Sequence, residues 1–202
     1  MKRSITAAIA ACFISANASA AVEVGKPAPN FTATDVYGKT VTLADLKGKP
    51  VVLEWHNPGC PFIVKHYVSG NMQKLQAYAK GQDVVWLSIN SSAEGKQGNM
   101  DAKAAKAMIE KDQYSLASHY LLDAKGDIGR LYDAKTTPHM FVIDAEGNIA
   151  YMGAIDDKPS ADKADIEGAK SYVRETIDNL KQDKPIELAS TSPYGCSVKY
   201  AN

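Results

Sequence analysis

The sequence predicts an α/β domain in which helices cover both faces of a central mixed sheet. Over residues 40–132, short apolar runs typical of strands alternate with segments of helical periodicity. Over residues 140–180, two further apolar runs flank a turn, and an amphipathic helix follows them. Parallel strands joined by helices form a sheet covered on both faces, and a hairpin adds antiparallel strands at its edge.

The first core strand is expected at residues 51–55, a compact apolar run that follows a Gly-Lys-Pro segment. A run this short, bounded by glycine and proline, is typical of a buried strand. Residues 57–59 have the turn sequence Asn-Pro-Gly. A helix then begins at Cys60 or Pro61, because proline is favoured at the first helical position.

The remaining elements follow from the same reasoning, with a period of two for strands and 3.6 for helices. Two apolar runs around a Gly-containing loop at 144–148 are the signature of a β-hairpin. Residues 21–184 form the domain, and residues 185–202 form a C-terminal tail without strong periodicity. Strands are expected at 40–43, 84–89, 120–122, 140–143 and 149–152, and helices at 72–81, 99–111, 128–132 and 165–180.

Residues 1–20 have the three parts of a secretory signal peptide. Two positive residues precede an apolar run at 5–14, and the small-residue cleavage signal Ala-Ser-Ala stands at 18–20. A membrane anchor is the alternative, but a spanning helix needs about 20 apolar residues. We therefore expect a mature chain that begins near Ala21, has no transmembrane segment and is periplasmic or secreted.

The charge balance argues against nucleic acid as a partner. The chain has 23 basic and 23 acidic residues, and no run of lysine and arginine forms a basic patch. Binding to phosphate backbones depends on such clustered positive charge.

The cysteines are more informative about function than the charge. Of the three cysteines, Cys12 leaves with the signal peptide, whereas Cys60 and Cys196 remain and can pair in an oxidising compartment.

Cys60 is the first candidate for a reactive residue. It follows a buried strand and a tight turn and stands at a helix N-terminus, where the helix dipole and free N–H groups favour the thiolate. The thiolate is the nucleophile in disulfide exchange and in peroxide reduction. The alternative is a small buried apolar side chain, which is a common role for an unpaired cysteine.

Three polar side chains near Cys60 in the sequence or the fold could assist it. His56 and His139 could stabilise a thiolate or transfer a proton, or they could be ordinary, partly exposed polar residues. Glu54, in a buried strand, could carry a proton with a raised pKa, or it could lie on a strand face that reaches solvent. A copper site built from cysteine and histidine is conceivable, but we predict no metal and no other cofactor.

Several segments together resemble the redoxin group, which contains the alkyl-hydroperoxide-reductase/thiol-specific-antioxidant proteins and the exported thioredoxin-like reductases. The resemblance covers roughly residues 24–177. It is carried by Gly25-Lys26-Pro27-Ala28-Pro29-Asn30-Phe31, the segment 43–53, Asn57-Pro58-Gly59-Cys60-Pro61-Phe62, Asp123-Ala124-Lys125-Gly126, Thr137-Pro138-His139-Met140 and Glu146-Gly147-Asn148. The resemblance implies a thioredoxin-like fold, a reactive Cys60 beside Pro61, and a cis peptide bond between Thr137 and Pro138.

The sequence departs from this group at three positions. Thioredoxin-like reductases carry Cys-x-x-Cys, but the second position here is Ile63, so Cys196 becomes the candidate resolving cysteine or resting-disulfide partner. Peroxiredoxins carry Thr or Ser three residues before the reactive cysteine and Pro seven before it, and here those residues are Asn57 and Leu53. Efficient peroxidase activity is therefore not expected.

The sequence thus predicts an exported thiol-dependent oxidoreductase, an antioxidant or disulfide-exchanging redoxin, that uses Cys60 on disulfides or peroxides. Its partners would be thiol or disulfide substrate proteins, small thiols or peroxides. The alternative is a thioredoxin-fold binding protein with weak or no turnover, whose ligand is a metal or a protein. A resolving thiol and a low pKa at Cys60 would distinguish the first function from the second.

Overall fold

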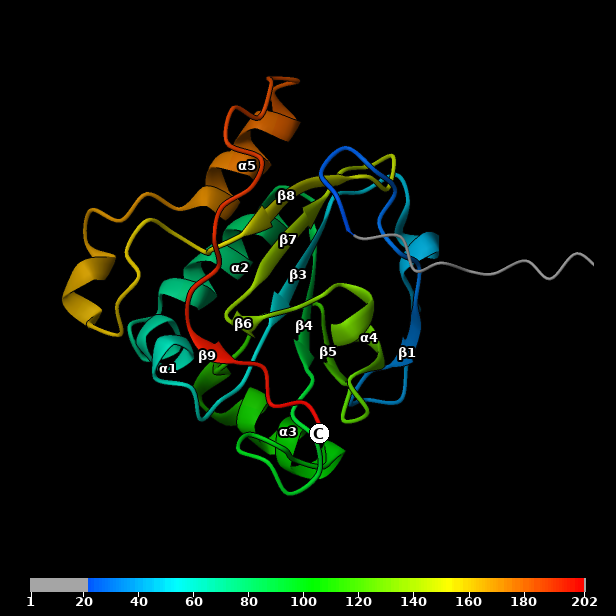
Figure 1. Cartoon of the computed structure of the whole chain (residues 1–202), viewed down its shortest axis with the longest axis vertical. Helices are drawn as coiled ribbons and strands as arrows, with labels where there is room; N and C mark the ends of the chain where they lie inside the picture. The colour runs from blue at the N-terminus through cyan, green and yellow to red at the C-terminus, as the bar shows by residue number, and fades with distance from the viewer. Residues whose placement is uncertain (1–21, 202) are drawn as a thin grey trace, which may run out of the picture.

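The computed structural model describes residues 22–201, and the expected signal peptide at 1–20 lies outside them. A five-stranded mixed sheet with the order β5-β4-β3-β7-β8 forms the centre (Figure 1). β3 pairs parallel with β4 and antiparallel with β7, β4 pairs parallel with β5, and β7 pairs antiparallel with β8. These strands are β3 (Val51–Trp55), β4 (Val85–Asn90), β5 (His119–Leu122), β7 (Met140–Ile143) and β8 (Ile149–Gly153).

Two small two-stranded sheets, five α-helices and three short 3-10 helices complete the described part of the chain. The small sheets pair β1 with β2 and β6 with β9. Their strands are β1 (Thr32–Thr34), β2 (Thr40–Thr42), β6 (Thr136–Thr137) and β9 (Cys196–Ser197), and the helices are α1 (Pro61–Val68), α2 (Asn71–Gly81), α3 (Ala102–Glu110), α4 (Asp127–Leu131) and α5 (Tyr172–Lys181).

The core consists of two apolar layers, one on each face of the sheet. The layer between the sheet and α1, α2 and α5 contains Val52, Ile63, Met72, Met140, Val142, Val173 and Ile177. The opposite layer lies under α4 and the N-terminal segment and contains Phe31, Val51, Leu53, Trp55, Leu87, Ile128 and Phe141. Alternate residues of β3 and β7 supply the two layers, as the period of two in a strand requires. The prediction of a mixed sheet with helices on both faces is confirmed.

One predicted helix is wrong over its first seven residues. The apolar spacing over residues 165–180 predicts a single helix, but the structure has a short 3-10 turn at Lys163–Ile166 and begins α5 only at Tyr172. Gly168 lies between them with φ +78°, a left-handed conformation that interrupts a helix. Ser171 then caps α5, because its side chain accepts a hydrogen bond from the Arg174 N–H.

Residues 185–202 are expected as a tail without regular structure, but the described part of this segment is packed along the molecule. The carbonyl oxygen of Ala189 accepts a hydrogen bond from the backbone N–H of Met152 in β8. Further along the segment, β9 pairs antiparallel with β6. In Figure 1 the red segment runs from α5 past α1 and β6 towards the C-terminus. It therefore crosses the carboxyl end of β3, where Cys60 lies.

Candidate functional site

Cys60 occupies the junction between β3 and α1. It is the N-cap of α1, and Pro61 is the first residue of that helix. The preceding turn is held by Asn57, whose Oδ1 accepts from the Gly59 N–H at 2.9 Å and whose carbonyl accepts from the Cys60 N–H at 3.0 Å. The Cys60 side chain is fully buried. The turn and helix expected from Asn-Pro-Gly-Cys-Pro are confirmed.

The peptide bond between Thr137 and Pro138 is cis, as the resemblance implies. The loop that carries it lies against Cys60, because Cys60 Sγ donates a hydrogen bond of 3.0 Å to the Thr137 carbonyl oxygen. The loop is also tied to β3, since the Trp55 N–H donates to the carbonyl of His139 at 3.0 Å. The structure thus brings three of the predicted site residues together: Cys60, Thr137 and Pro138.

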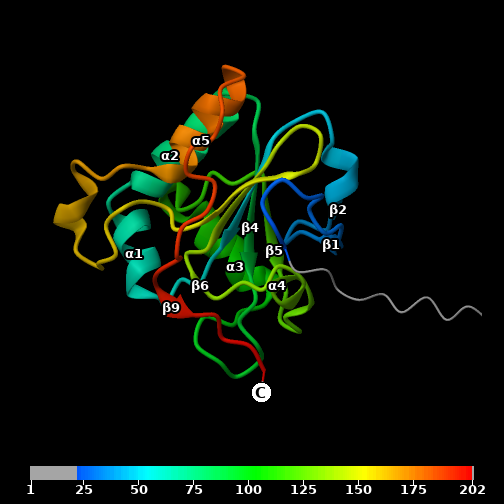
Figure 2. The same ribbon diagram turned by 45° about the horizontal axis from the view of Figure 1, so that its top comes forward.

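Cys196 joins this group from the C-terminal segment. β9 lies beside β6 (Figure 2), and in their register Cys196 stands opposite Thr137, which precedes the cis proline. Cys196 packs against the apolar cluster that contains Cys60, each thiol shifts the pKa of the other, and both are free thiols. The thiol beside Cys60 thus comes from a residue far along the sequence and not from position 63.

The two thiols differ in acidity. Burial raises the pKa of Cys60, but hydrogen bonds from the side chains of Cys196 and Thr137 and from the Ile63 backbone favour the thiolate, so the pKa lies below its ordinary value. For Cys196, burial and the hydrogen bond to Cys60 raise the pKa to about 11. The Cys60 thiol is therefore the more acidic of the two, and the neighbouring Cys196 thiol favours its charged form.

Glu54 lies in β3 and is completely buried. Its carboxylate accepts hydrogen bonds from four side chains: Trp86 Nε1, Ser88 Oγ and Tyr67 Oη, each at 2.8 Å, and Gln76 Nε2 at 3.3 Å. Burial raises its pKa, and these hydrogen bonds oppose the shift. The alternative of a solvent-facing Glu54 is wrong. The residue lies in the same layer as Cys60, under α1 and α2, as a buried acid.

Neither candidate histidine is brought to Cys60 by a hydrogen bond in the described residues. Both nitrogens of His56 are paired with tyrosine hydroxyls, Nδ1 with Tyr120 at 2.7 Å and Nε2 with Tyr114 at 3.1 Å. The ring of His139 packs on Phe141, in the opposite core layer from Cys60. Burial lowers the pKa of His56 to about 3 and that of His139 to about 4, so both are neutral at neutral pH. The idea that either is an ordinary, partly exposed residue is wrong, because both are buried.

Tyr194 and Asp156 also take part in the site, and the sequence reasoning missed them. The Tyr194 hydroxyl donates to Asp156 Oδ1, and its ring packs on Phe62 of α1 with 5.8 Å between centroids. The available signal was the segment Pro193-Tyr194-Gly195-Cys196, which places an aromatic residue and a glycine beside the second cysteine. The aromatic residue anchors the segment against α1.

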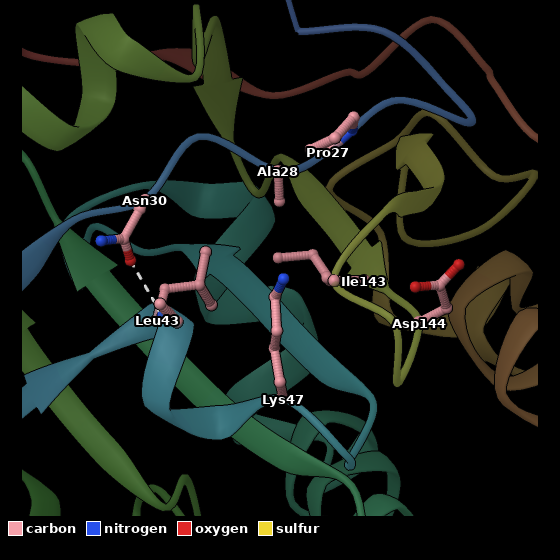
Figure 3. Close-up of a pocket in the computed structure, with 9 residues that line it drawn as sticks. Pro27, Ala28, Asn30, Leu43, Lys47, Ile143 and Asp144 are labelled. Carbon is pink, nitrogen blue, oxygen red and sulfur yellow. Dashed lines mark hydrogen bonds between the residues drawn. The ribbon is translucent and has the colours of Figure 1, made fainter.

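The cavity in Figure 3 does not belong to this site. It has a volume of about 140 Å³ and lies between Leu43, Lys47 and Ile143, at the far end of β7 from Pro138.

Within residues 22–201, no three His, Cys, Asp or Glu side chains cluster as ligands for a metal ion. In the same range, no helix is both long and apolar enough to cross a membrane.

A mixed sheet with a buried cysteine at the start of a helix and a cis proline opposite it defines a thioredoxin-like protein. The Redoxin family model matches residues 23–170, and the chain belongs to that family. Among curated proteins, it is similar to the thiol-disulfide oxidoreductase ResA of Bacillus thuringiensis, with 30% identity over 123 residues. That match covers 61% of this chain and 65% of ResA, so the chain spans less than two thirds of the relative's length.

Solved structures support the same fold. An uncharacterized conserved protein from Geobacillus kaustophilus superposes with a TM-score of 0.76 at 25% identity, covering 90% of this chain and 94% of that one. A candidate thiol:disulfide interchange protein DsbE from Chlorobium tepidum has a TM-score of 0.55 at 26% identity, covering 80% and 99%. The thioredoxin-like fold implied by the sequence is therefore confirmed.

Proposed function

We propose that this protein is a thiol-disulfide oxidoreductase whose nucleophile is Cys60 and whose second thiol is Cys196. The observation that supports this most directly is the proximity of the two thiols at the N-terminus of α1, where both lie against Thr137 beside cis-Pro138. The lowered pKa of Cys60 and the raised pKa of Cys196 support these two roles. Similarity to ResA and the DsbE-type protein agrees with this activity.

The reaction proceeds in two exchanges. The Cys60 thiolate attacks one sulfur of a substrate disulfide, the substrate S–S bond breaks, and a mixed disulfide forms while one substrate thiolate leaves. The Cys196 thiol then loses its proton and attacks Cys60 Sγ, which releases the second substrate thiolate. The substrate disulfide gains two electrons and becomes two thiols, and the protein is left with a Cys60–Cys196 disulfide. An external dithiol reductant restores the free thiols.

Glu54 has the properties of a proton carrier in this cycle. It is an acid of raised pKa in the same core layer as Cys60, so it can accept and release a proton without contact with solvent. Thr137 and Pro138 position the substrate, since their loop lies directly against the nucleophile. In this proposal His56 and His139 have structural roles and no direct part in the exchange. The ring nitrogens of His56 are hydrogen-bonded to tyrosine hydroxyls, and His139 accepts from the Lys135 N–H and packs on Phe141.

Peroxides are lesser substrates in this proposal. The side-chain amide of Asn57 stands where a peroxiredoxin has its hydroxyl, and both of its polar atoms already form hydrogen bonds. Asn57 Oδ1 accepts from the Gly59 N–H, and Asn57 Nδ2 donates to the Gln97 carbonyl at 3.1 Å. Leu53 is a buried core residue on the other face of the sheet. Cys60 can still form a sulfenic acid slowly, which Cys196 would resolve, so the antioxidant capacity is small.

The substrates are disulfide-bearing proteins or small disulfides outside the cytoplasm. This location rests on the signal-peptide pattern at residues 1–20, and a compartment in which disulfides persist suits the reaction. The alternative function is a thioredoxin-fold binding protein without turnover. An oxidoreductase carries out disulfide exchange at Cys60, whereas a binding protein without turnover does not, so a measurement of this exchange distinguishes the two functions.

The test follows the fate of a mixed disulfide in three proteins treated with glutathione disulfide. We expect the wild type to give a Cys60–Cys196 disulfide, the variant Cys196→Ser to retain glutathione on Cys60, and the variant Cys60→Ser to react at least about 100-fold more slowly. Non-reducing peptide mapping identifies each species. Glutathione retained equally in the wild type and in Cys196→Ser would exclude Cys196 as the resolving thiol. An inert Cys60 would favour the binding protein.

A further inference from the structure

Residues 191–200, which we call the strap, are fixed at both ends. At the first end Thr191 extends the edge of the sheet, since its N–H donates to the Met152 carbonyl at 3.1 Å and its Oγ1 accepts from the Ala154 N–H at 2.9 Å. At the other end the Tyr200 hydroxyl donates to the Ala134 carbonyl at 3.0 Å. The intervening segment is therefore stretched across the site.

The middle of the strap makes backbone contacts that an external strand would otherwise make. Cys196 and Ser197 pair antiparallel with β6, and the Val198 N–H donates to the Lys135 carbonyl at 3.0 Å. An extended peptide that adds to a sheet edge uses the same main-chain pairing. The edge beside Pro138 is thus already occupied.

Gly195 permits this close approach. Its φ is +135°, and a Cβ at this position would lie 2.2 Å from the Thr137 carbonyl oxygen. That oxygen also accepts the hydrogen bond from Cys60 Sγ. A larger residue at position 195 would have to move the strap away from the cis-proline loop, because the neighbour is backbone and not a flexible side chain.

The strap also closes the nucleophile off from solvent. Cys60 is 0% exposed, although it is the residue that must reach a substrate. The Tyr194 ring lies against Phe62 on one side, and its hydroxyl is held by Asp156. Figures 1 and 2 both show the strap passing between α1 and the loop that carries β6.

We propose that the strap is an internal substitute for substrate: it occupies the β6 edge, and an extended disulfide-bearing segment of a protein substrate must displace it to reach Cys60. This inference rests on the proposed function. It specifies the substrate class as unfolded or flexible polypeptide that can pair as a strand. It also makes displacement of the strap a step of the reaction, before the first exchange.

The test measures the rate at which Cys60 forms a mixed disulfide in the Cys196→Ser background, in which the strap has no thiol. The probes are an extended peptide that carries a disulfide to glutathione, and glutathione disulfide itself. Adding Gly195→Ala should raise the rate with the peptide about tenfold or more, and the rate with glutathione disulfide by less. The smaller gain is expected because the small probe does not need the β6 edge.

Gly38→Ala is the matched control. Gly38 has φ +86°, and a Cβ there meets nothing within 4 Å, so the substitution strains the backbone far from the strap and should leave both rates unchanged. Tyr194→Phe is a second, milder variant that removes only the hydrogen bond to Asp156, and it should accelerate the peptide reaction by a smaller factor. Near-ultraviolet circular dichroism checks that each variant is folded.

The outcomes separate this inference from the proposed function. A reactive Cys60 with the same peptide rate in all variants overturns the strap as a substitute for substrate and leaves the oxidoreductase intact. Equal gains for both probes also overturn it, because the strap would then shield the thiol without occupying the peptide edge. A Cys60 that reacts with neither probe in any variant contradicts the proposed function itself.

Discussion

At the scale of single residues, the site depends on Cys60, which is buried and yet more acidic than a free cysteine. Burial alone would favour the neutral thiol, so the hydrogen bonds from Cys196, Thr137 and the start of α1 must outweigh it. The strand-turn-helix context predicts the helix N-terminus from sequence. The contribution of Cys196 could not be derived in this way, because it depends on how a segment 136 positions away folds back.

The acidity of Cys60 can be measured through the absorbance of its thiolate near 240 nm. We expect a midpoint below ~8.5, the value of a free cysteine. The variant Cys196→Ala should move the midpoint upward, because it removes the largest favourable hydrogen bond. Cys60→Ala is the control and should abolish the transition below ~8.5, because burial, the largest cause of the raised pKa of Cys196, remains after the Cys60 thiol is removed. A midpoint at or above ~8.5 in the wild type would contradict the assignment of Cys60 as nucleophile.

At the scale of elements, the strands and helices around the site follow directly from local sequence. The run at 51–55, the turn before Cys60, the helix at 72–81 and the hairpin at 140–152 all lie where periodicity and turn residues predict them. Two features could not be predicted. β9 has only two residues and no periodicity, and it exists because β6 offers it an edge. α5 begins late because the segment before it binds elsewhere, with the Lys170 N–H donating to Asp157.

The late start of α5 makes Ser171 important for stability. Its hydroxyl accepts from the Arg174 N–H at 3.3 Å, and the helix it caps buries Val173 and Ile177 against the sheet. Ser171→Ala should lower the free energy of unfolding in urea by about 1 kcal/mol, the usual value of an N-cap. Ser171→Asp keeps an acceptor at the cap and should retain most of the stability. Equal losses in both variants would show that the cap contributes nothing.

At the scale of the whole molecule, polar groups are buried on both faces of the sheet. Three of the four histidines have pKa values lowered by burial, His56 and His66 to about 3 and His139 to about 4. Burial shifts the acids Glu54 and Asp156 in the opposite direction and raises their pKa values. The sequence predicts which positions are apolar, but it does not predict these buried polar groups, because their hydrogen-bond partners come from distant elements. His56, for example, pairs with Tyr114 and Tyr120.

The buried histidines should make the protein sensitive to acid. A histidine with an ordinary pKa near 6.5 in the unfolded chain binds a proton there before the folded chain does. The free energy of unfolding therefore falls as pH drops from about 6.5 towards the folded pKa, by up to ~1.4 kcal/mol per pH unit for each such group. Glu54 and Asp156 oppose this loss, because their raised pKa values mean that the folded chain binds their protons more readily.

A single substitution isolates one histidine from these opposing groups. His139→Asn keeps a hydrogen-bond acceptor for the Lys135 N–H, which His139 Nδ1 now accepts at 3.2 Å. Because His139 titrates at about 4 in the folded chain, the variant should lose stability less steeply between pH 6.5 and 4, by about 1.4 kcal/mol per pH unit. Above pH 7 its curve should run parallel to that of the wild type, whatever the cost of the substitution. Urea unfolding at each pH measures both slopes, and parallel curves down to pH 4 would mean that His139 takes up its proton equally in the folded and unfolded chains.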